Sequence, residues 1–176
     1  NPGAVVIAVD RHFSGDFKPY IYATTDFGTT WRSLTGDLPG NVYARSVMHD
    51  PRNAHMIYAG LENGLYTSWD DGAHWYLMGL GLPNVSVYDM YIQPQRNDLI
   101  LATHGRSVWI LDDLTPLQEY TPEIGRQALH LFPIRDAYRY AQWSEVEPLG
   151  DGAFYGDNPQ FGATITYTLG DSAATP

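Results

Sequence analysis

An internal repeat is the feature that most constrains how this chain can fold. Residues 24–31, with the sequence TTDFGTTW, recur as residues 68–75, SWDDGAHW, so that Asp26 and Asp70 lie 44 positions apart. A third copy lies 43 positions further on at Asp113, but the glycine and the tryptophan that follow the aspartate in the first two copies are missing there. A fixed period of this length indicates one supersecondary unit used three times in succession.

Each repeat divides into short apolar segments separated by turn sequences rich in Asp, Asn, Gly and Pro. The predicted strands are 5–9, 20–23 and 31–34 in the first repeat, 43–49, 56–59, 65–68 and 74–78 in the second, and 87–93, 99–103, 108–111 and 128–132 in the third. Four strands in roughly 40–45 residues is the pattern of a β-propeller blade. We therefore predict an all-β fold with about three four-stranded blades of a larger β-propeller.

The repeats also set the predicted domain limits. These are a partial propeller at 1–134, with blades at about 1–40, 41–83 and 84–134, a connector at 135–160, and the start of a truncated C-terminal β-domain at 161–176. Within the third repeat, Thr115 as N-cap and Pro116 at the first helical position predict one short helix that extends to about Tyr120. Residues 162–169 have the pattern of a strand whose natural partners would follow Pro176, so we expect this strand to pair poorly or not at all.

Charge and composition exclude several classes of partner. The chain has 20 acidic and 10 basic residues and a formal net charge of −10, which opposes binding to the phosphate backbone of nucleic acid. It has no cysteine, which excludes disulfides, thiolate metal sites and a cysteine nucleophile. The histidines show no ligand spacing, and no apolar run reaches the roughly 18–20 residues that span a bilayer. We predict no metal, no cofactor, no nucleic acid partner and no membrane span.

The repeated motif has a structural explanation in the physical chemistry of a tight hairpin. An aspartate within the turn can accept hydrogen bonds from backbone N–H groups of the same turn, the glycine supplies a positive φ, and the tryptophan covers the turn. The residues with these predicted roles are Asp26, Gly28 and Trp31 in the first copy and Asp70, Gly72 and Trp75 in the second. The two copies are expected to behave alike. A calcium loop is disfavoured, because counting from Asp70 places Gly81, and no glutamate, at position 12.

The pattern S/T-x-D-x-G-x-T-W is the Asp box, or BNR repeat, and the wider sequence resembles a family that carries it. Residues 102–117, ATHGRSVWILDDLTPL, resemble a stretch near the end of the sortilin-like propellers of exported bacterial proteins, often labelled BNR-repeat glycosyl hydrolases. Residues 131–133 and 161–167 resemble that family's passage into a β-sandwich. The resemblance implies the last three blades of such a propeller, and a location in the periplasm, on the outer surface or outside the cell.

His104 and Arg106 form the most interesting polar cluster, on a predicted turn between two strands of the third repeat. As a ligand-facing loop, it would offer His104 for acid–base chemistry and Arg106 for binding a carboxylate. As structure, Gly105 would form the turn, His104 would bond to backbone and Arg106 would pair with an acid of a neighbouring blade. The structural interpretation is favoured. The aromatic-rich segment 135–162 is similarly interpreted as a connector held against the propeller rim, with a carbohydrate-stacking strip as the alternative.

The function that these observations predict is binding without catalysis. We expect an exported segment that acts as a scaffold or recognises peptide, protein or glycan, with the remaining blades of the same propeller as its other partners. The alternative is part of a glycoside hydrolase whose catalytic acids lie mainly outside this segment. Hydrolysis needs two carboxylates across a cleft, and no spacing selects a pair among the candidate acids Asp16, Asp37, Asp50, Glu62 and Asp89.

Overall fold

The computed structural model describes residues 1–79, 81–138 and 161–170, which fold mostly into antiparallel β-sheets with little helix. Two compact units are present, one at Asn1–Leu114 and one that begins at Thr115. The β-rich character of the predicted fold is confirmed. None of the helices in the described ranges is long and apolar enough to cross a membrane.

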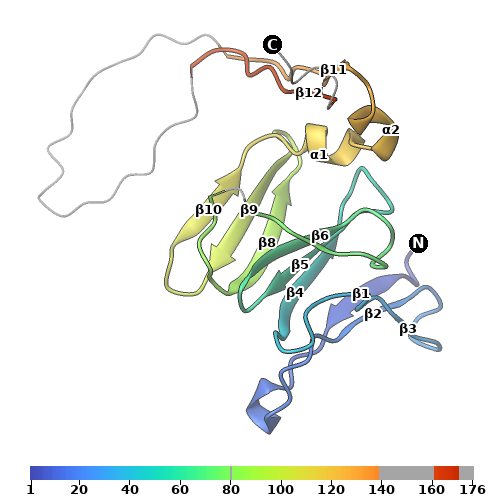
Figure 1. The fold of residues 1–176 in the computed structure, drawn as a ribbon. Helices are drawn as coiled ribbons and strands as arrows, with labels where there is room; N and C mark the ends of the chain where they lie inside the picture. Colours follow the sequence, from blue (N-terminus) through green and yellow to red (C-terminus); the bar gives the residue numbers. More distant parts are fainter. Residues whose placement is uncertain (80, 139–160, 171–176) are drawn as a thin grey trace, which may run out of the picture. The chain divides into compact units, whose positions relative to one another are not determined.

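The first unit contains three antiparallel sheets (Figure 1). Their strands are β1 (Val5–Ala8), β2 (Ile21–Thr24) and β3 (Arg32–Ser33) in the first sheet, β4 (Ala44–His49), β5 (Ile57–Leu61), β6 (Gly64–Ser68) and β7 (Tyr76–Leu77) in the second, and β8 (Val87–Gln93), β9 (Asp98–Thr103) and β10 (Val108–Leu111) in the third. A short 3-10 helix, η1 (His12–Ser14), follows β1. Each of these strands overlaps one predicted from the repeat.

The three sheets pack against one another through β1, β4, β5 and β8. Gly60 in β5 permits this close approach, because a Cβ atom there would collide with the Ser46 side chain and the Val87 carbonyl. Ser46 Oγ donates a hydrogen bond across the gap to Val87 O at 3.2 Å. A buried hydrophobic cluster joins the first two sheets and contains Ile21, Leu34, Leu38, Ala44, Ile57, Ala59, Leu61, Tyr66 and Trp75.

The strand register places the Asp boxes and the turns that contain Glu62 and His104 at opposite ends of these sheets. Ile57 at the start of β5 pairs with Ser68, which leads into the second Asp box. Leu61 at the end of β5 pairs with Gly64, and Glu62 lies in the turn between them. The Asp boxes therefore occupy one end of the sheets, and the turns that follow β1, β5 and β9 occupy the other.

The second unit begins with two short helices, α1 (Thr115–Glu119) and α2 (Pro122–Gly125), the first of them as predicted. The strands β11 (Leu129–Leu131) and β12 (Tyr167–Leu169) then form an antiparallel pair. Residues 128–132 were predicted to be the fourth strand of the third repeat, so their pairing with β12 is a correction. The expectation that 162–169 pairs poorly or not at all is wrong for Tyr167–Leu169, which β11 pairs from within the chain, whereas residues 162–166 form no strand. Most of the predicted connector, 139–160, and residues 171–176 lie outside the described residues.

Candidate binding site

The two Asp-box turns share one hydrogen-bond pattern. Asp26 Oδ1 accepts a bond from the Thr30 N–H at 2.9 Å, and Asp70 Oδ1 accepts one from the His74 N–H at 2.9 Å. The backbone bonds predicted for both aspartates are thus confirmed. The glycine of the second box has φ +83°, and a Cβ there would also collide with Leu34 of the preceding repeat.

These turns also hold both aspartates in the ionised form. The backbone N–H of Thr30, together with the hydroxyls of Thr24 and Thr30, lowers the pKa of Asp26 to about 2. Burial raises the pKa of Asp70, but bonds from His74 and Ser68 outweigh that effect and the pKa lies below its usual value. A carboxylate held in this way is suited to organising a turn and poorly suited to donating a proton.

The two tryptophans of the boxes differ in environment. Trp75 is 7% exposed, and its Nε1 donates to Leu34 O at 3.0 Å and to Gly72 O at 3.1 Å. Trp31 is 45% exposed. Leu34, which accepts the first of these bonds, lies 41 positions before Trp75 in the preceding repeat. The expectation that both tryptophans are equally buried is therefore wrong.

At the opposite end of the sheets, two β-bulges occur at matching positions. In the second sheet Ala44 pairs with Leu61 and Ser46 pairs with Gly60, which leaves Arg45 as the extra residue of β4. In the third sheet the register shifts in the same way between Val87 and Asp89, which leaves Tyr88 as the extra residue of β8. A bulge redirects a side chain away from the alternation of the strand, and bulges are frequent beside functional sites.

The turns beside these bulges also match between sheets. The Glu62 N–H donates to Tyr43 O at 3.2 Å, and the His104 N–H donates to Ser86 O at 3.0 Å, so Glu62 and His104 occupy equivalent positions. Asp10 lies after β1, and Glu62 lies after β5. Each of these two strands pairs with the strand that leads into an Asp box, so the two carboxylates lie at the same end of their sheets. Asp10, Glu62 and His104, which come from three successive repeats, thus lie at the same end of the unit.

Aromatic side chains and Arg45 form a continuous stack across this end. The His12 and Tyr43 rings are stacked with centroids 4.6 Å apart, and the Arg45 guanidinium lies 4.6 Å from the Tyr43 ring and 4.5 Å from the Tyr88 ring. His104 meets the Tyr88 ring edge-on at 5.0 Å. The members of the stack, which we call the rim stack, are in order Phe13, His12, Tyr43, Arg45, Tyr88 and His104.

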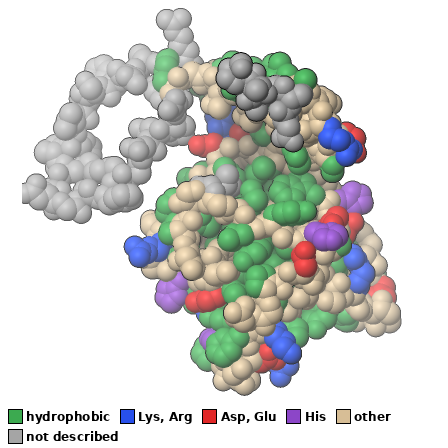
Figure 2. Space-filling view, viewed as in Figure 1, with side chains coloured by type: hydrophobic (Ala, Val, Ile, Leu, Met, Phe, Trp, Pro, Cys, Tyr) green, Lys and Arg blue, Asp and Glu red, His purple; other side chains and the backbone are tan. Residues whose placement is uncertain are grey.

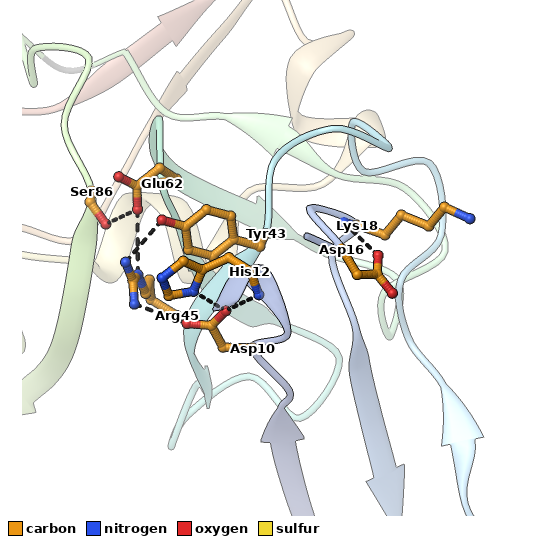
Figure 3. Close-up of polar contacts among 8 residues, drawn as sticks. All are labelled: Asp10, His12, Asp16, Lys18, Tyr43, Arg45, Glu62 and Ser86. Carbon is orange, nitrogen blue, oxygen red and sulfur yellow. Dashed lines mark hydrogen bonds and ion pairs between the residues drawn. The ribbon is translucent and has the colours of Figure 1, made fainter. Parts of the chain in front are cut away.

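Arg45 also connects the hydrogen bonds of this region (Figure 3). Its Nη1 donates to Asp10 Oδ2 at 2.9 Å, its Nε donates to Glu62 Oε2 at 3.4 Å, and its Nη2 donates to the Tyr43 hydroxyl at 2.9 Å. Ser86, at the start of the third sheet, donates to Glu62 Oε2 at 2.8 Å. One guanidinium therefore ties together groups from all three sheets.

The carboxylates bound to Arg45 are stabilised in their ionised forms. For Asp10, burial raises the pKa, but hydrogen bonds from His12 and the charge of Arg45 outweigh it, and the pKa falls below its usual value. For Glu62, burial again raises the pKa, and hydrogen bonds from Tyr43 and Ser86 together with Arg45 lower it further than burial raises it. Both residues remain negatively charged at neutral pH.

The two residues predicted for a ligand-facing loop separate in the structure. His104 lies at one end of the rim stack, and Gly105 forms the turn with φ +76°. Arg106 stands outside the stack: its carbonyl accepts a bond from Trp109 Nε1 at 2.8 Å, and within the described ranges no ion pair joins it to an acid. Sequence reasoning missed Arg45 and Tyr88, although their separation of 43 positions matches the repeat.

Charged groups of both signs are scattered over the face of the molecule that Figure 2 shows. On this face, acidic, basic and histidine side chains lie among hydrophobic ones, and Lys and Arg do not gather in one patch. Within the part of the chain that the structure describes, no group of three or more His, Cys, Asp or Glu residues is arranged to hold a metal ion. Comparison of the sequence with protein-family models and with curated proteins finds no match.

Proposed function

We propose that this chain is part of a sortilin-like β-propeller from an exported protein, and that the rim stack and its carboxylates form a non-catalytic surface that binds peptide, protein or glycan. Three antiparallel sheets in sequence order, joined through β1, β4, β5 and β8, support the propeller. The same Asp-box hairpin in two of them supports it further. The remaining blades would be partners within the same protein.

The observation that carries the binding role is the pair of matching bulges. Regular pairing of β4 with β5 and of β8 with β9 would keep Arg45 and Tyr88 in the alternation of their strands. The bulges remove them from that alternation, and the two side chains stack on each other. Tyr88 still exposes 42% of its surface and Phe13 exposes 94%. Tyrosine and arginine are the residues that most often dominate binding energy at interfaces. A surface built in this way can hold a ligand against fixed aromatic groups.

The carboxylates support binding over hydrolysis. A glycosidase that acts through two carboxyl groups needs one of them protonated near neutral pH, which requires a raised pKa. Asp10 and Glu62 have lowered pKa values and are both bonded to Arg45. Neither is suited to act as the general acid in this arrangement.

The second candidate is a part of a glycoside hydrolase. One specific observation favours it, namely that Asp10 and Glu62 reach the same guanidinium, at 2.9 and 3.4 Å, so two carboxylates from different repeats lie close together. For this candidate, substrate would have to displace Arg45 and raise the pKa of one of the two carboxyls.

Ligand binding by a Tyr88→Ala variant tests the proposal. We expect wild-type protein to bind members of a peptide and glycan array and the variant to lose that binding. Tyr91→Ala is the matched control, because Tyr91 lies in the same strand, is 57% exposed and is outside the bulge. Equal binding by wild type and Tyr88→Ala would contradict the rim as the binding surface. Hydrolysis of a glycan that disappears in Asp10→Asn or Glu62→Gln would establish the second candidate instead.

A further inference from the structure

We propose that the ligand of the rim stack is a basic peptide segment, and that one of its Lys or Arg side chains is held between Glu62 and Tyr88. This inference rests on the proposed binding function and names the ligand class. It follows from the bonding of the two carboxylates, from the exposure of the aromatic rings and from the balance of charge around Arg45.

Of the two carboxylates, Glu62 is the one with capacity for a ligand. Asp10 uses both oxygens within the protein, since Oδ1 contacts the His12 backbone N–H and Nδ1 and Oδ2 contacts Arg45. The bonds of Glu62 to Arg45 and Ser86 both involve Oε2, and the Tyr43 hydroxyl also bonds to this carboxylate. The side chain is nevertheless 41% exposed, so the carboxylate can accept a further bond from outside the protein.

Tyr88 and this carboxylate share Arg45 as a neighbour. Both residues contact the Arg45 guanidinium, which covers one part of the Tyr88 ring and leaves 42% of the residue exposed. A cation placed against an aromatic ring and near a carboxylate gains from the ring quadrupole and from the ion pair together. The side chains of lysine and arginine supply a cation on a flexible apolar stem, which fits an exposed tyrosine next to a glutamate.

The charge around Arg45 also favours a cation. One guanidinium is shared by two ionised carboxylates, so these three groups keep one excess negative charge. The whole chain carries a formal net charge of −10. Complementary charge speeds the approach of a basic ligand and suppresses the binding of an acidic one.

Arg45 acts as a positioning residue in this proposal. Its side chain is 16% exposed and three of its nitrogen atoms are bonded to Asp10, Glu62 and Tyr43. It therefore fixes the direction of Glu62 and the plane of Tyr88 without facing the ligand. The exposed rings of Phe13 and Phe17 extend the same end of the unit and can contact apolar residues that flank the basic side chain.

The test is a titration of the full chain with three probes, monitored by calorimetry and by NMR chemical shifts. The probes are a blocked peptide containing Lys and Arg between glycines, the same peptide with Glu at those positions, and a neutral β-linked glucose oligosaccharide. We expect only the basic peptide to bind, and we expect Glu62→Gln and Tyr88→Ala each to weaken that binding by about tenfold or more. Glu123→Gln is the control, because it removes the same charge from an exposed residue of the second unit.

Each outcome has one meaning. Equal weakening by Glu62→Gln and Glu123→Gln would show that only net charge matters and would overturn the inference. Binding of the oligosaccharide or of the acidic peptide, lost in Tyr88→Ala, would overturn the basic ligand but leave the proposed binding function standing. Binding of none of the probes, with array binding also lacking, would contradict both. A thermal unfolding transition close to that of wild type must accompany each variant, and Tyr88→Phe, which keeps the ring, should retain binding.

Discussion

The Arg45 guanidinium lies 4.5 Å from the centre of the Tyr88 ring, and each residue is the extra residue of a β-bulge at the same position of its sheet. The same register shift in β4 and β8 therefore brings together two side chains that are 43 positions apart. Repeats that share a backbone feature can differ in the side chain that it presents. Here one repeat presents a cation and the next presents an aromatic ring, and the two are complementary.

Removal of the Arg45 side chain should destabilise the first unit. Arg45→Ala leaves Asp10 and Glu62 without their common partner in a partly buried position, and it removes the packing between Tyr43 and Tyr88. The expected loss of unfolding free energy is about 1–3 kcal/mol, as for the loss of a bonded partner to charged groups. Urea denaturation followed by tryptophan fluorescence measures it.

Arg126→Ala provides the comparison for this change. Arg126 forms an ion pair with Glu123 in which both side chains are more than two-thirds exposed, at 71% and 72%. Exposed pairs contribute little, so its removal should cost less than about 1 kcal/mol. Equal effects of the two substitutions would show that Arg45 does not hold the three sheets together.

The two tryptophans of the Asp boxes should differ in their contributions to stability. Trp75→Ala should cost about 3–5 kcal/mol, because it empties a buried site between the first two sheets and removes the bond to Leu34 O. Trp31→Ala should cost less than about 1 kcal/mol, because Trp31 is exposed. Chemical denaturation of both variants gives the comparison. A loss at Trp31 as large as that at Trp75 would contradict this assignment of their environments.

The features of this fold that its sequence predicts are those held by local interactions. The bonds of Asp26 and Asp70 span four residues, so the motif alone specifies them. Strand positions also followed from the repeat, because the alternation of apolar segments and turns is local. These features could be predicted without knowing how the strands pair.

The rim stack could not be predicted, because it depends on strand register and on contacts between sheets. No particular residue type in the sequence marks the position of a β-bulge. The ion pairs of Arg45 with Glu62 and Asp10 also require segments from different repeats to come together. The pairing of β11 with β12 was missed for a related reason. Both strands are apolar and short, and their sequences do not specify which partner each one takes.

The Asp26 turn should resist acid. Bonds from the Thr30 backbone and from the hydroxyls of Thr24 and Thr30 lower its pKa from 3.8 to about 2. A carboxyl with a lowered folded-state pKa contributes its full stabilisation above the unfolded-state pKa and loses it as the pH falls through the folded-state value. The contribution of Asp26 should therefore be complete above about pH 4 and lost toward pH 2. An NMR titration of the side-chain carboxyl carbon measures its pKa directly.

A Thr30→Val variant tests the cause of this shift. Valine keeps the backbone N–H that bonds to Asp26 Oδ1 and removes the hydroxyl that donates to Oδ2 at 2.7 Å. The pKa of Asp26 should rise toward its usual value and remain below it. A Thr29→Val variant is the control, because the Thr29 hydroxyl donates to the Asp26 carbonyl and not to the carboxylate. The interpretation fails if Thr30→Val leaves the pKa unchanged.

The second Asp box should respond to pH in the opposite direction. His74 replaces the threonine of the first box, and its Nδ1 lies 2.6 Å from Asp70 Oδ2. The hydrogen bond and the charge of Asp70 raise the pKa of His74 above 6.5. A histidine with a raised folded-state pKa stabilises the fold fully below its unfolded-state pKa, and this contribution is lost as the pH rises through the folded-state value.

The His74 contribution to stability should therefore be present at pH 5.5 and decline as the pH rises above about 6.5 and through the raised folded-state pKa. His74→Thr restores the residue type of the first box, whose hydroxyl can bond to the carboxylate at any pH in this range. The difference in unfolding free energy between wild type and His74→Thr should favour wild type more at pH 5.5 than at pH 8, and urea denaturation at both values measures it. Using the difference cancels the contributions of all residues that the two proteins share. A difference that is the same at both pH values would show that the His74 and Asp70 side chains do not interact through the histidine's charge.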